Sequence, residues 1–318
     1  MRKKIFAYCM GLTLLVGMHL QANTANAATS TYDQTRYPIV LVGGFMAFDS
    51  IFGIEYFYGV SDELRKNGAV VLDSDVSKFQ TNEFRGEELI HQIENFLAVT
   101  GASKVNLIGH SQGAATARYV AAVRPDLVAS VTSVHGMNRG TPIATFFLKV
   151  APPGSAAAAL LAGVTKAFGY LVSLLSGGPD ATAQSAIAIM KGADPEDYKR
   201  FNALYPAGLP ASDCGTVGDA SKNGIAYWSW GGTGAAVTNP LDPLDTLLLN
   251  LISKMIPSGV KSDGVVPLCG QYLGTPIRHS YRHNHIDAMN HLFGLIGFEV
   301  SPKSLYRTHV NRLKTAGL

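Results

Sequence analysis

The feature of this sequence best suited to do chemistry is a serine between two glycines, in the order Gly109-His110-Ser111-Gln112-Gly113. The pattern G-x-S-x-G exposes a serine hydroxyl as a nucleophile when it forms a sharp turn between a strand and a helix. The glycines leave room where the two elements crowd together, so the serine can hold a strained backbone. Because the pattern is short enough to arise by chance, its flanks decide whether it is used.

The flanks of this pattern have the required form. Residues 104–108 (KVNLI) predict a buried strand that enters the turn. Residues 114–123 (AATARYVAAV) predict a helix, which Arg124-Pro125 ends. Ser111 is therefore predicted to be a nucleophile on a strand-turn-helix elbow.

A serine nucleophile needs a base to remove its proton, and the base needs a carboxylate to orient it. For this kind of elbow the expected order along the chain is Ser, then Asp or Glu, then His. Asp263 is the candidate carboxylate, although an ordinary Asp-Gly turn would have the same local sequence. The candidate bases are five histidines: His279, His283, His285, His291 and His309.

His285 is the favoured base because it lies in a polar loop directly before a helical pattern. Loops carry catalytic bases more often than helix faces do. Two backbone N–H groups must also stabilise the oxyanion that forms on attack. We expect them from Gln112, directly after the nucleophile, and from Phe45, in the loop after the first strand.

Strands and helices alternate through the first half of the chain. Apolar runs at 37–42, 69–72 and 128–134 predict strands, in addition to the strand before the elbow. One helix is predicted from about 61 to 68, and another carries its apolar face from Leu89 to Leu97. This alternation favours right-handed crossovers, so we predict an α/β fold with a mostly parallel sheet flanked by helices.

Residues 145–175 interrupt this alternation with a largely apolar stretch whose charges are Lys149 and Lys166. The stretch is either a mobile apolar cover or one or two ordinary core helices, and the residues alone leave both interpretations open. A membrane span is disfavoured because Gly163 and Gly169 interrupt a run of barely sufficient length.

The first 27 residues have the form of an export signal. Basic residues at positions 2–4 precede an apolar run from Ile5 to Leu20, and Ala-Asn-Ala at 25–27 provides a cleavage site. A retained membrane anchor is the alternative, but glycines and a histidine interrupt the run. We predict that residues 28–318 form a single α/β catalytic domain that is secreted.

Loss of the leader would remove three basic residues and no acidic one, leaving 23 Lys and Arg against 23 Asp and Glu. The composition therefore gives no support to nucleic-acid binding. Cys214 and Cys269 would be the remaining cysteines, and export would place them in an oxidising compartment. We expect them to form a disulfide, with two buried free thiols as the alternative.

Three stretches of this chain resemble the secreted triacylglycerol lipases of the Pseudomonas and Burkholderia type: residues 37–49 (YPIVLVGGFMAFD), 104–133 and 262–318. The resemblance implies an α/β-hydrolase fold with a helical lid at about 145–175 that opens at a lipid–water interface. It also implies a catalytic triad of Ser111, Asp263 and His285, with Phe45 and Gln112 as backbone oxyanion donors. Gly43 departs from the family's usual histidine, Phe45 from its usual Met or Leu, and Gln112 from its usual histidine.

The resemblance further implies a structural calcium ion, held by the carboxylates of Asp242 and Asp287 and the main-chain carbonyls of His291 and Leu295. Hard oxygen ligands suit calcium, and an ion bound there would fix the loop that carries the base. The family's disulfide falls on the same two cysteines. A membrane-anchored foldase and export through the periplasm and outer membrane are implied as well.

These observations predict a secreted serine ester hydrolase that cleaves long-chain triacylglycerols to fatty acids and glycerides through an acyl-enzyme. A carboxylesterase for short soluble esters, without interfacial activation, is the nearest alternative. A non-catalytic binding protein would share the fold, since fold alone does not fix function. A lyase or perhydrolase would share the triad.

Overall fold

The computed structural model describes residues 30–45, 50–51, 54–77, 80–150, 192–234, 249–250, 252–291, 293–296 and 299–318. The predicted leader, Asp242 and the predicted lid beyond residue 150 lie outside these ranges. Within the described ranges, no helix combines the length and the apolar character that crossing a bilayer requires.

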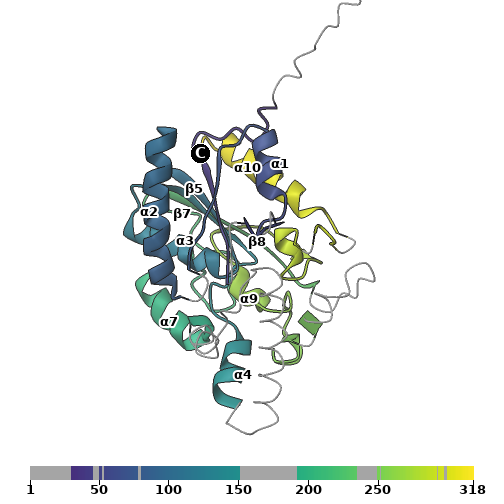
Figure 1. The fold of residues 1–318 in the computed structure, drawn as a ribbon. Helices are drawn as coiled ribbons and strands as arrows, with labels where there is room; N and C mark the ends of the chain where they lie inside the picture. The colour runs from purple at the N-terminus through teal and green to yellow at the C-terminus, as the bar shows by residue number, and fades with distance from the viewer. Residues whose placement is uncertain are drawn as a thin grey trace, which may run out of the picture.

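Among the described residues, a seven-stranded, mostly parallel sheet forms the centre of the fold (Figure 1). Its strands follow the order β4-β1-β5-β6-β8-β7, and β9 also pairs with β8. All neighbours are parallel except β7, which is antiparallel to β8. The strands are β1 (Ile39–Val42), β4 (Val71–Asp73), β5 (Val105–His110), β6 (Val128–Val134), β7 (Ser221–Lys222), β8 (Ile225–Gly232) and β9 (Thr275–Tyr281).

The four strands predicted from apolar runs are confirmed as β1, β4, β5 and β6. Every residue of β1, β5 and β6 is buried, as expected when helices cover both faces of a parallel sheet. Alternate residues of β1 enter different cores: Val40 and Val42 pack on one face of the sheet, Ile39 and Leu41 on the other. A continuous apolar run is therefore what a central strand here requires.

Helices cover the sheet on both faces, as predicted (Figure 1). One face packs against α2 (Asn82–Thr100), α3 (Gln112–Val123) and α7 (Pro195–Leu204). The other packs against α1 (Val60–Lys66) and α10 (Pro302–Thr315). Helix α2 begins where the Thr81 side chain accepts the Phe84 N–H, and it ends at the left-handed Gly101.

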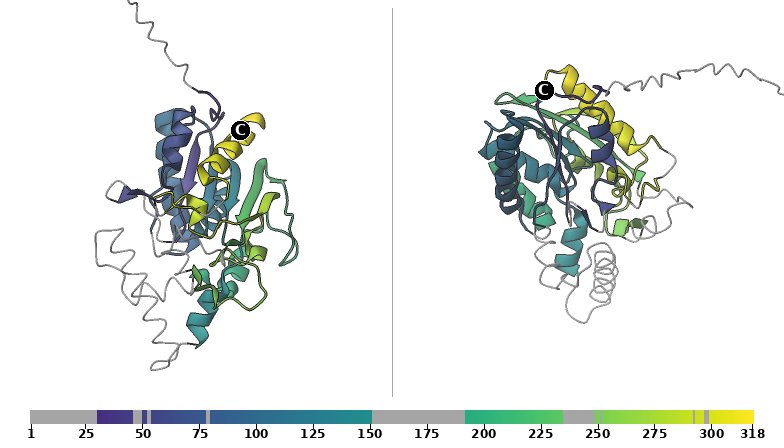
Figure 2. Two further views of the ribbon diagram at one scale, coloured as in Figure 1. Left: turned by 90° about the vertical axis from the view of Figure 1, so that its right-hand side faces the viewer. Right: turned by 45° about the horizontal axis from the view of Figure 1, so that its top comes forward.

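Short elements complete the described fold. Helix α4 (Pro142–Val150) lies at the end of the molecule opposite the carboxyl terminus (Figure 2). Residues 145–150 of the predicted lid fall in this helix, so the described part of that stretch is helical. The others are β2 (Ser50–Ile51), β3 (Ile54–Glu55), α9 (Leu268–Gln271) and the 3-10 helix η2 (Asp287–Met289).

Candidate active site

Ser111 forms the turn between β5 and α3, as the sequence predicts. Its backbone has φ 56° and ψ −125°, a conformation that residues with a side chain rarely adopt. A Cβ on Gly113 would lie 2.1 Å from the carbonyl oxygen of Val42, so only glycine fits between α3 and β1. The local sequence thus forces a strained serine onto the end of a central strand.

The structure brings Ser111 together with His285 and Asp263. His285 Nε2 lies 2.8 Å from Ser111 Oγ, and His285 Nδ1 lies 2.8 Å from Asp263 Oδ2. The backbones are joined too, because the His285 N–H donates to the Asp263 carbonyl at 2.9 Å. A hydroxyl, an imidazole and a carboxylate in this order are the parts that nucleophilic catalysis by serine needs.

Asp263 is fully buried and remains ionised. Its Oδ1 accepts the N–H groups of Val265 at 3.0 Å and Val266 at 2.8 Å. Burial favours the neutral acid, but the imidazoles of His285 and His135 outweigh it and hold the pKa of Asp263 well below its usual range. An ionised carboxylate only accepts hydrogen bonds, so His285 must carry its proton on Nδ1 and leave Nε2 free to accept from Ser111.

Among the five candidate histidines, His285 is the one whose ring reaches both Ser111 and Asp263. His279 stacks on Tyr272, and the ring of His283 hydrogen-bonds the Val300 carbonyl. His291 lies beside the Tyr58 ring, and His309 hydrogen-bonds Thr132 in β6.

His110, within the elbow, ties the nucleophile to the loop of the candidate base. Its Nε2 lies 3.0 Å from the His285 carbonyl, which can only accept, so Nε2 carries the proton. Nδ1 therefore accepts from the Tyr56 hydroxyl at 2.7 Å, and that hydroxyl accepts the Gly44 N–H at 3.1 Å. Burial lowers the pKa of His110 well below its usual range, which keeps the ring neutral.

The two predicted oxyanion donors lie in segments next to the nucleophile. Gln112 is the first residue of α3, so its N–H precedes the intrahelical hydrogen bonds. Phe45 follows β1, which pairs with β5 so that Val42 lies opposite Gly109. The loop after β1 therefore runs beside the elbow.

A buried arginine that the sequence analysis missed holds this loop. The Arg85 guanidinium donates to the carbonyls of Gly43 at 2.6 Å and Gly44 at 3.1 Å. Burial lowers its pKa to about 10, which leaves it a cation at neutral pH. Arg85 lies on α2, and no local sequence pattern connects it with a loop more than forty residues earlier.

The described part of the predicted calcium site fits a hard cation. Asp287 is buried, with its Oδ2 accepting the Asn284 N–H at 3.0 Å. The chain then turns at Asn290, which has a left-handed φ of 59°, and the Asn290 N–H donates to the Asp287 carbonyl at 2.8 Å, so residues 287–290 form a tight turn after the candidate base. A buried carboxylate followed by main-chain carbonyls of His291 and Leu295 is an oxygen donor set of the kind that calcium prefers.

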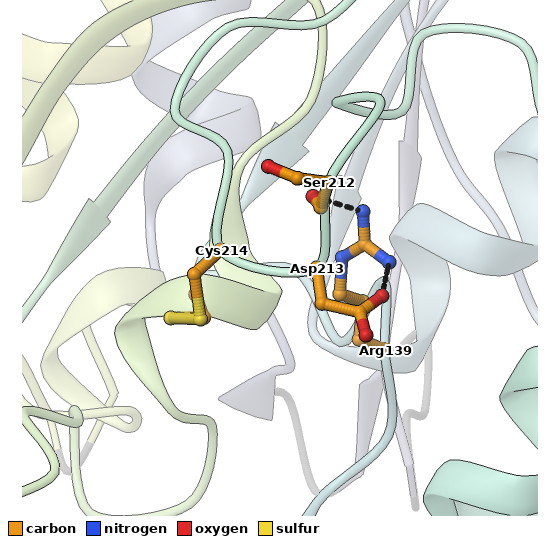
Figure 3. The surroundings of a disulfide bond; sticks show 5 residues. Arg139, Ser212, Asp213 and Cys214 are labelled. Carbon is orange, nitrogen blue, oxygen red and sulfur yellow. Dashed lines mark hydrogen bonds and ion pairs between the residues drawn. A yellow bond between two sulfur atoms is a disulfide. The ribbon is translucent and has the colours of Figure 1, made fainter.

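Cys214 and Cys269 form the predicted disulfide, with Cα atoms 4.6 Å apart (Figure 3). Cys269 lies in α9, which follows the Asp263 turn, and Cys214 lies in an exposed loop. Arg139 anchors the same loop through the Asp213 carboxylate at 2.8 Å and the Ser212 carbonyl at 2.9 Å. Closing a loop of this length contributes about 4 kcal/mol on the chain-entropy model.

The sheet topology and this site define a class of protein, the α/β hydrolases. Residues 37–220 match the family model described as alpha/beta hydrolase fold, and the chain belongs to that family. The sequence prediction of this fold is confirmed.

Two related proteins show a more specific similarity than the family model does. The triacylglycerol lipase of Vibrio cholerae serotype O1 is 45% identical over 315 residues, which cover 96% of this chain and 99% of that protein. The triacylglycerol lipase of Pseudomonas fragi is 40% identical over 289 residues, with 89% and 98% covered. The resemblance found in the sequence is therefore confirmed.

A solved structure agrees on the fold. The crystal structure of Staphylococcus hyicus lipase matches 92% of this chain and 98% of its own, with a TM-score of 0.58. Its sequence is 14% identical, so this likeness concerns the fold alone.

Proposed function

We propose that this chain is a secreted serine hydrolase that cleaves long-chain triacylglycerols to fatty acids and glycerides. The observation that carries the proposal is the hydrogen-bonded series from Ser111 Oγ through His285 to Asp263, with both contacts at 2.8 Å. Relatives named triacylglycerol lipases support the substrate class. The leader predicted at residues 1–27 supports export through the periplasm.

The first half-reaction forms an acyl-enzyme. Ser111 Oγ attacks the ester carbonyl carbon while His285 Nε2 takes the hydroxyl proton. Asp263 accepts a hydrogen bond from the Nδ1–H group of His285 and stabilises the resulting imidazolium, while the proton stays on His285. When the carbon–oxygen ester bond breaks, His285 returns the proton to the departing glyceride oxygen.

Water completes the cycle. His285 Nε2 removes a proton from a water molecule, whose oxygen attacks the acyl-enzyme carbonyl. The bond to Ser111 Oγ then breaks, the serine regains its proton from His285, and the fatty acid leaves. The triad returns to its starting state, and each cycle consumes one ester bond and one water molecule.

The negative charge that develops on the carbonyl oxygen is met by the N–H groups of Gln112 and Phe45. The amino-terminal end of α3 adds the positive end of its dipole at the same place. Arg85 supports this role by fixing the carbonyls of residues 43 and 44. Each donor contributes about 3 kcal/mol of transition-state stabilisation.

A structural calcium ion belongs to the proposal. Asp242, Asp287 and the carbonyls of His291 and Leu295 would hold it, and when bound it would supply positive charge that fixes the loop after His285. The burial of the Asp287 carboxylate supports this assignment.

The other partners follow from the resemblance in the sequence. Residues 145–175 act as a lid that opens at a lipid–water interface, and a membrane-anchored foldase assists folding during export. The apolar composition of this stretch supports the lid.

Ser111→Ala tests the chemistry, because removing the nucleophile leaves no atom to acylate. We expect turnover of p-nitrophenyl esters to fall by at least about 10⁴-fold and labelling by an organophosphonate to disappear. Ser221→Ala, at an exposed position in β7, is the control and should retain both. Near wild-type turnover by Ser111→Ala would refute the proposal.

The substrate class is tested separately with emulsified triolein and soluble butyrate esters. A lipase with a lid should gain activity once triolein exceeds its solubility, because the interface displaces the apolar cover. A preference for butyrate esters, with no gain at the interface, would instead identify a short-chain carboxylesterase.

A further inference from the structure

A second histidine, His135, contacts the carboxylate of the proposed triad. It follows β6 directly and its main-chain N–H donates to the Trp230 carbonyl at 2.9 Å. Its backbone has φ 45°, in the left-handed region where residues other than glycine are strained. Glycine would hold this conformation without strain, so a histidine here is explained by what its imidazole does.

The imidazole of His135 reaches the same carboxylate oxygen as His285. His135 Nδ1 lies 3.0 Å from Asp263 Oδ2, and the side chains of His135 and Asp263 are both fully buried. A Cβ on Gly232 would lie 2.6 Å from His135 Cε1, so glycine at that position in β8 provides the space for the ring. Two adjacent strands of the sheet, β6 and β8, thus form the space that this imidazole occupies.

The direction of this hydrogen bond follows from the charge of Asp263. Because the ionised carboxylate only accepts, His135 must present its proton on Nδ1. His135 Nε2 is buried and lacks a hydrogen-bond partner among the described residues, so a second proton there would have no acceptor. Burial lowers the pKa of His135 although the Asp263 carboxylate raises it, and the net lowering keeps the ring neutral.

We infer that His135 is a positioning residue that fixes the orientation of the Asp263 carboxylate toward His285; this inference rests on the proposed function. Oδ1 is held by two backbone N–H groups, and Oδ2 by His135 together with His285. A neutral donor orients the carboxylate and leaves its negative charge available to the His285 imidazolium. A cationic donor would compete for that charge.

Three substitutions of His135 separate the effect of losing the hydrogen bond from the effect of changing the backbone strain. His135→Gly removes the donor and suits the positive φ. His135→Asn places an amide N–H where Nδ1 lies, and asparagine tolerates left-handed backbone. His135→Gln moves the amide one bond further, away from that position. His279→Asn, at a buried histidine that stacks on Tyr272, is the matched control.

The measurement is kcat and KM for p-nitrophenyl butyrate, with Tm recorded for each variant. We expect His135→Gly and His135→Gln to lose about tenfold or more in kcat at unchanged KM, and His135→Asn to recover most of the loss. The downfield NMR resonance of the His285 Nδ1 proton should shift in the first two variants and return in His135→Asn. His279→Asn should keep its kcat.

The inference is overturned if His135→Gly folds and keeps kcat within twofold of the wild type. It is also overturned if Asn and Gln variants have the same kcat, since that result would show a role in packing only. Failure of the proposed function looks different: the Ser111→Ala variant would then retain near wild-type turnover, whatever the His135 variants do.

Discussion

At the scale of single residues, Asp263 is where the hydrogen bonds of the site converge. Both of its oxygens are occupied, each by two donors, and it is fully buried. Its four donors hold it ionised in a place where an isolated carboxylate would take up a proton. The ionised state in turn fixes the tautomer of His285, so one charge determines which imidazole nitrogen faces the nucleophile.

Asp263→Asn should therefore lower kcat by about 10⁴-fold, because an amide can donate to Nδ1 and stabilise the unproductive tautomer of His285. KM for a soluble ester should change little. Steady-state kinetics measures both values, and Asp213→Asn, at an exposed carboxylate, is the control. A loss in kcat smaller than tenfold would show that Asp263 is not the orienting carboxylate.

At the scale of secondary structure, the site depends on how closely α3 approaches the sheet. The elbow joins β5 to α3, and Gly113 places the first turn of the helix against the carbonyl of Val42 in β1. This contact sets the amino-terminal end of α3 beside the loop that carries Phe45. The two proposed oxyanion donors are therefore brought together by packing between elements that are far apart in the chain.

Gly113→Ala tests this packing. A Cβ would lie 2.1 Å from the Val42 oxygen, so helix and strand must separate. We expect a loss of stability of at least about 1–3 kcal/mol and slower organophosphonate labelling of Ser111. Thermal unfolding and labelling rates measure the two effects. Gly192→Ala is the control because a Cβ there meets no described atom within 4 Å, and equal Tm values for the two variants would contradict the prediction.

At the scale of the whole molecule, stability should depend on pH through buried histidines. Besides His110 and His135, burial lowers the pKa of four more histidines: His279 to about 3, His283 to about 4, His291 to about 4 and His309 to about 3. In the unfolded chain these groups titrate near 6.5, so below that pH the unfolded state binds more protons. The stabilisation is complete above pH 6.5 and is lost as pH falls toward 3 or 4.

Each such histidine should lower the free energy of unfolding by about 1.4 kcal/mol for each pH unit below 6.5, until its own folded pKa is reached. Urea unfolding between pH 7.5 and pH 5 measures this slope. His309→Gln should reduce the slope by the share of one histidine, whereas His91→Gln, at an exposed position on α2, should not. A stability that is flat over this range would refute the prediction.

Calcium removal should affect the stability of the whole molecule, because the proposed ion would join residue 242 to the loop after His285. Prolonged chelation should lower Tm and activity together, and added calcium should restore both. Asp287→Asn should weaken this calcium response, with Asp126→Asn at an exposed position as the control. If chelation changes neither Tm nor activity, the calcium assignment is wrong.

Much of the fold could be predicted from local pattern. The apolar run predicted at 128–134 is β6, residue for residue, and the buried β1 and β5 were equally clear because a parallel strand covered on both faces must be apolar throughout. β8 and β9 were not predicted. β9 alternates weakly, with exposed and half-buried residues, so its assignment depends on pairing with β8.

Part of the site could also be predicted from local sequence pattern. His135 directly follows a predicted strand next to the elbow strand, and residues at the carboxyl ends of neighbouring parallel strands share an edge. That signal was present in the sequence. The contact of His135 with Asp263 could not be predicted, because it depends on a positive φ at His135 and on the space beside Gly232.

The sequence by itself determined the nucleophile and the turn that presents it, since Gly109 leaves room for the backbone of Gly113, only four residues later. It also determined the buried strands and the two cysteines that pair. The tertiary structure decided which imidazole meets Ser111 and which carboxylate meets that imidazole. The hydrogen bond from the Ser111 hydroxyl to His285 Nε2 spans 174 positions of sequence, and only the order of the strands in the sheet brings such distant residues within 2.8 Å.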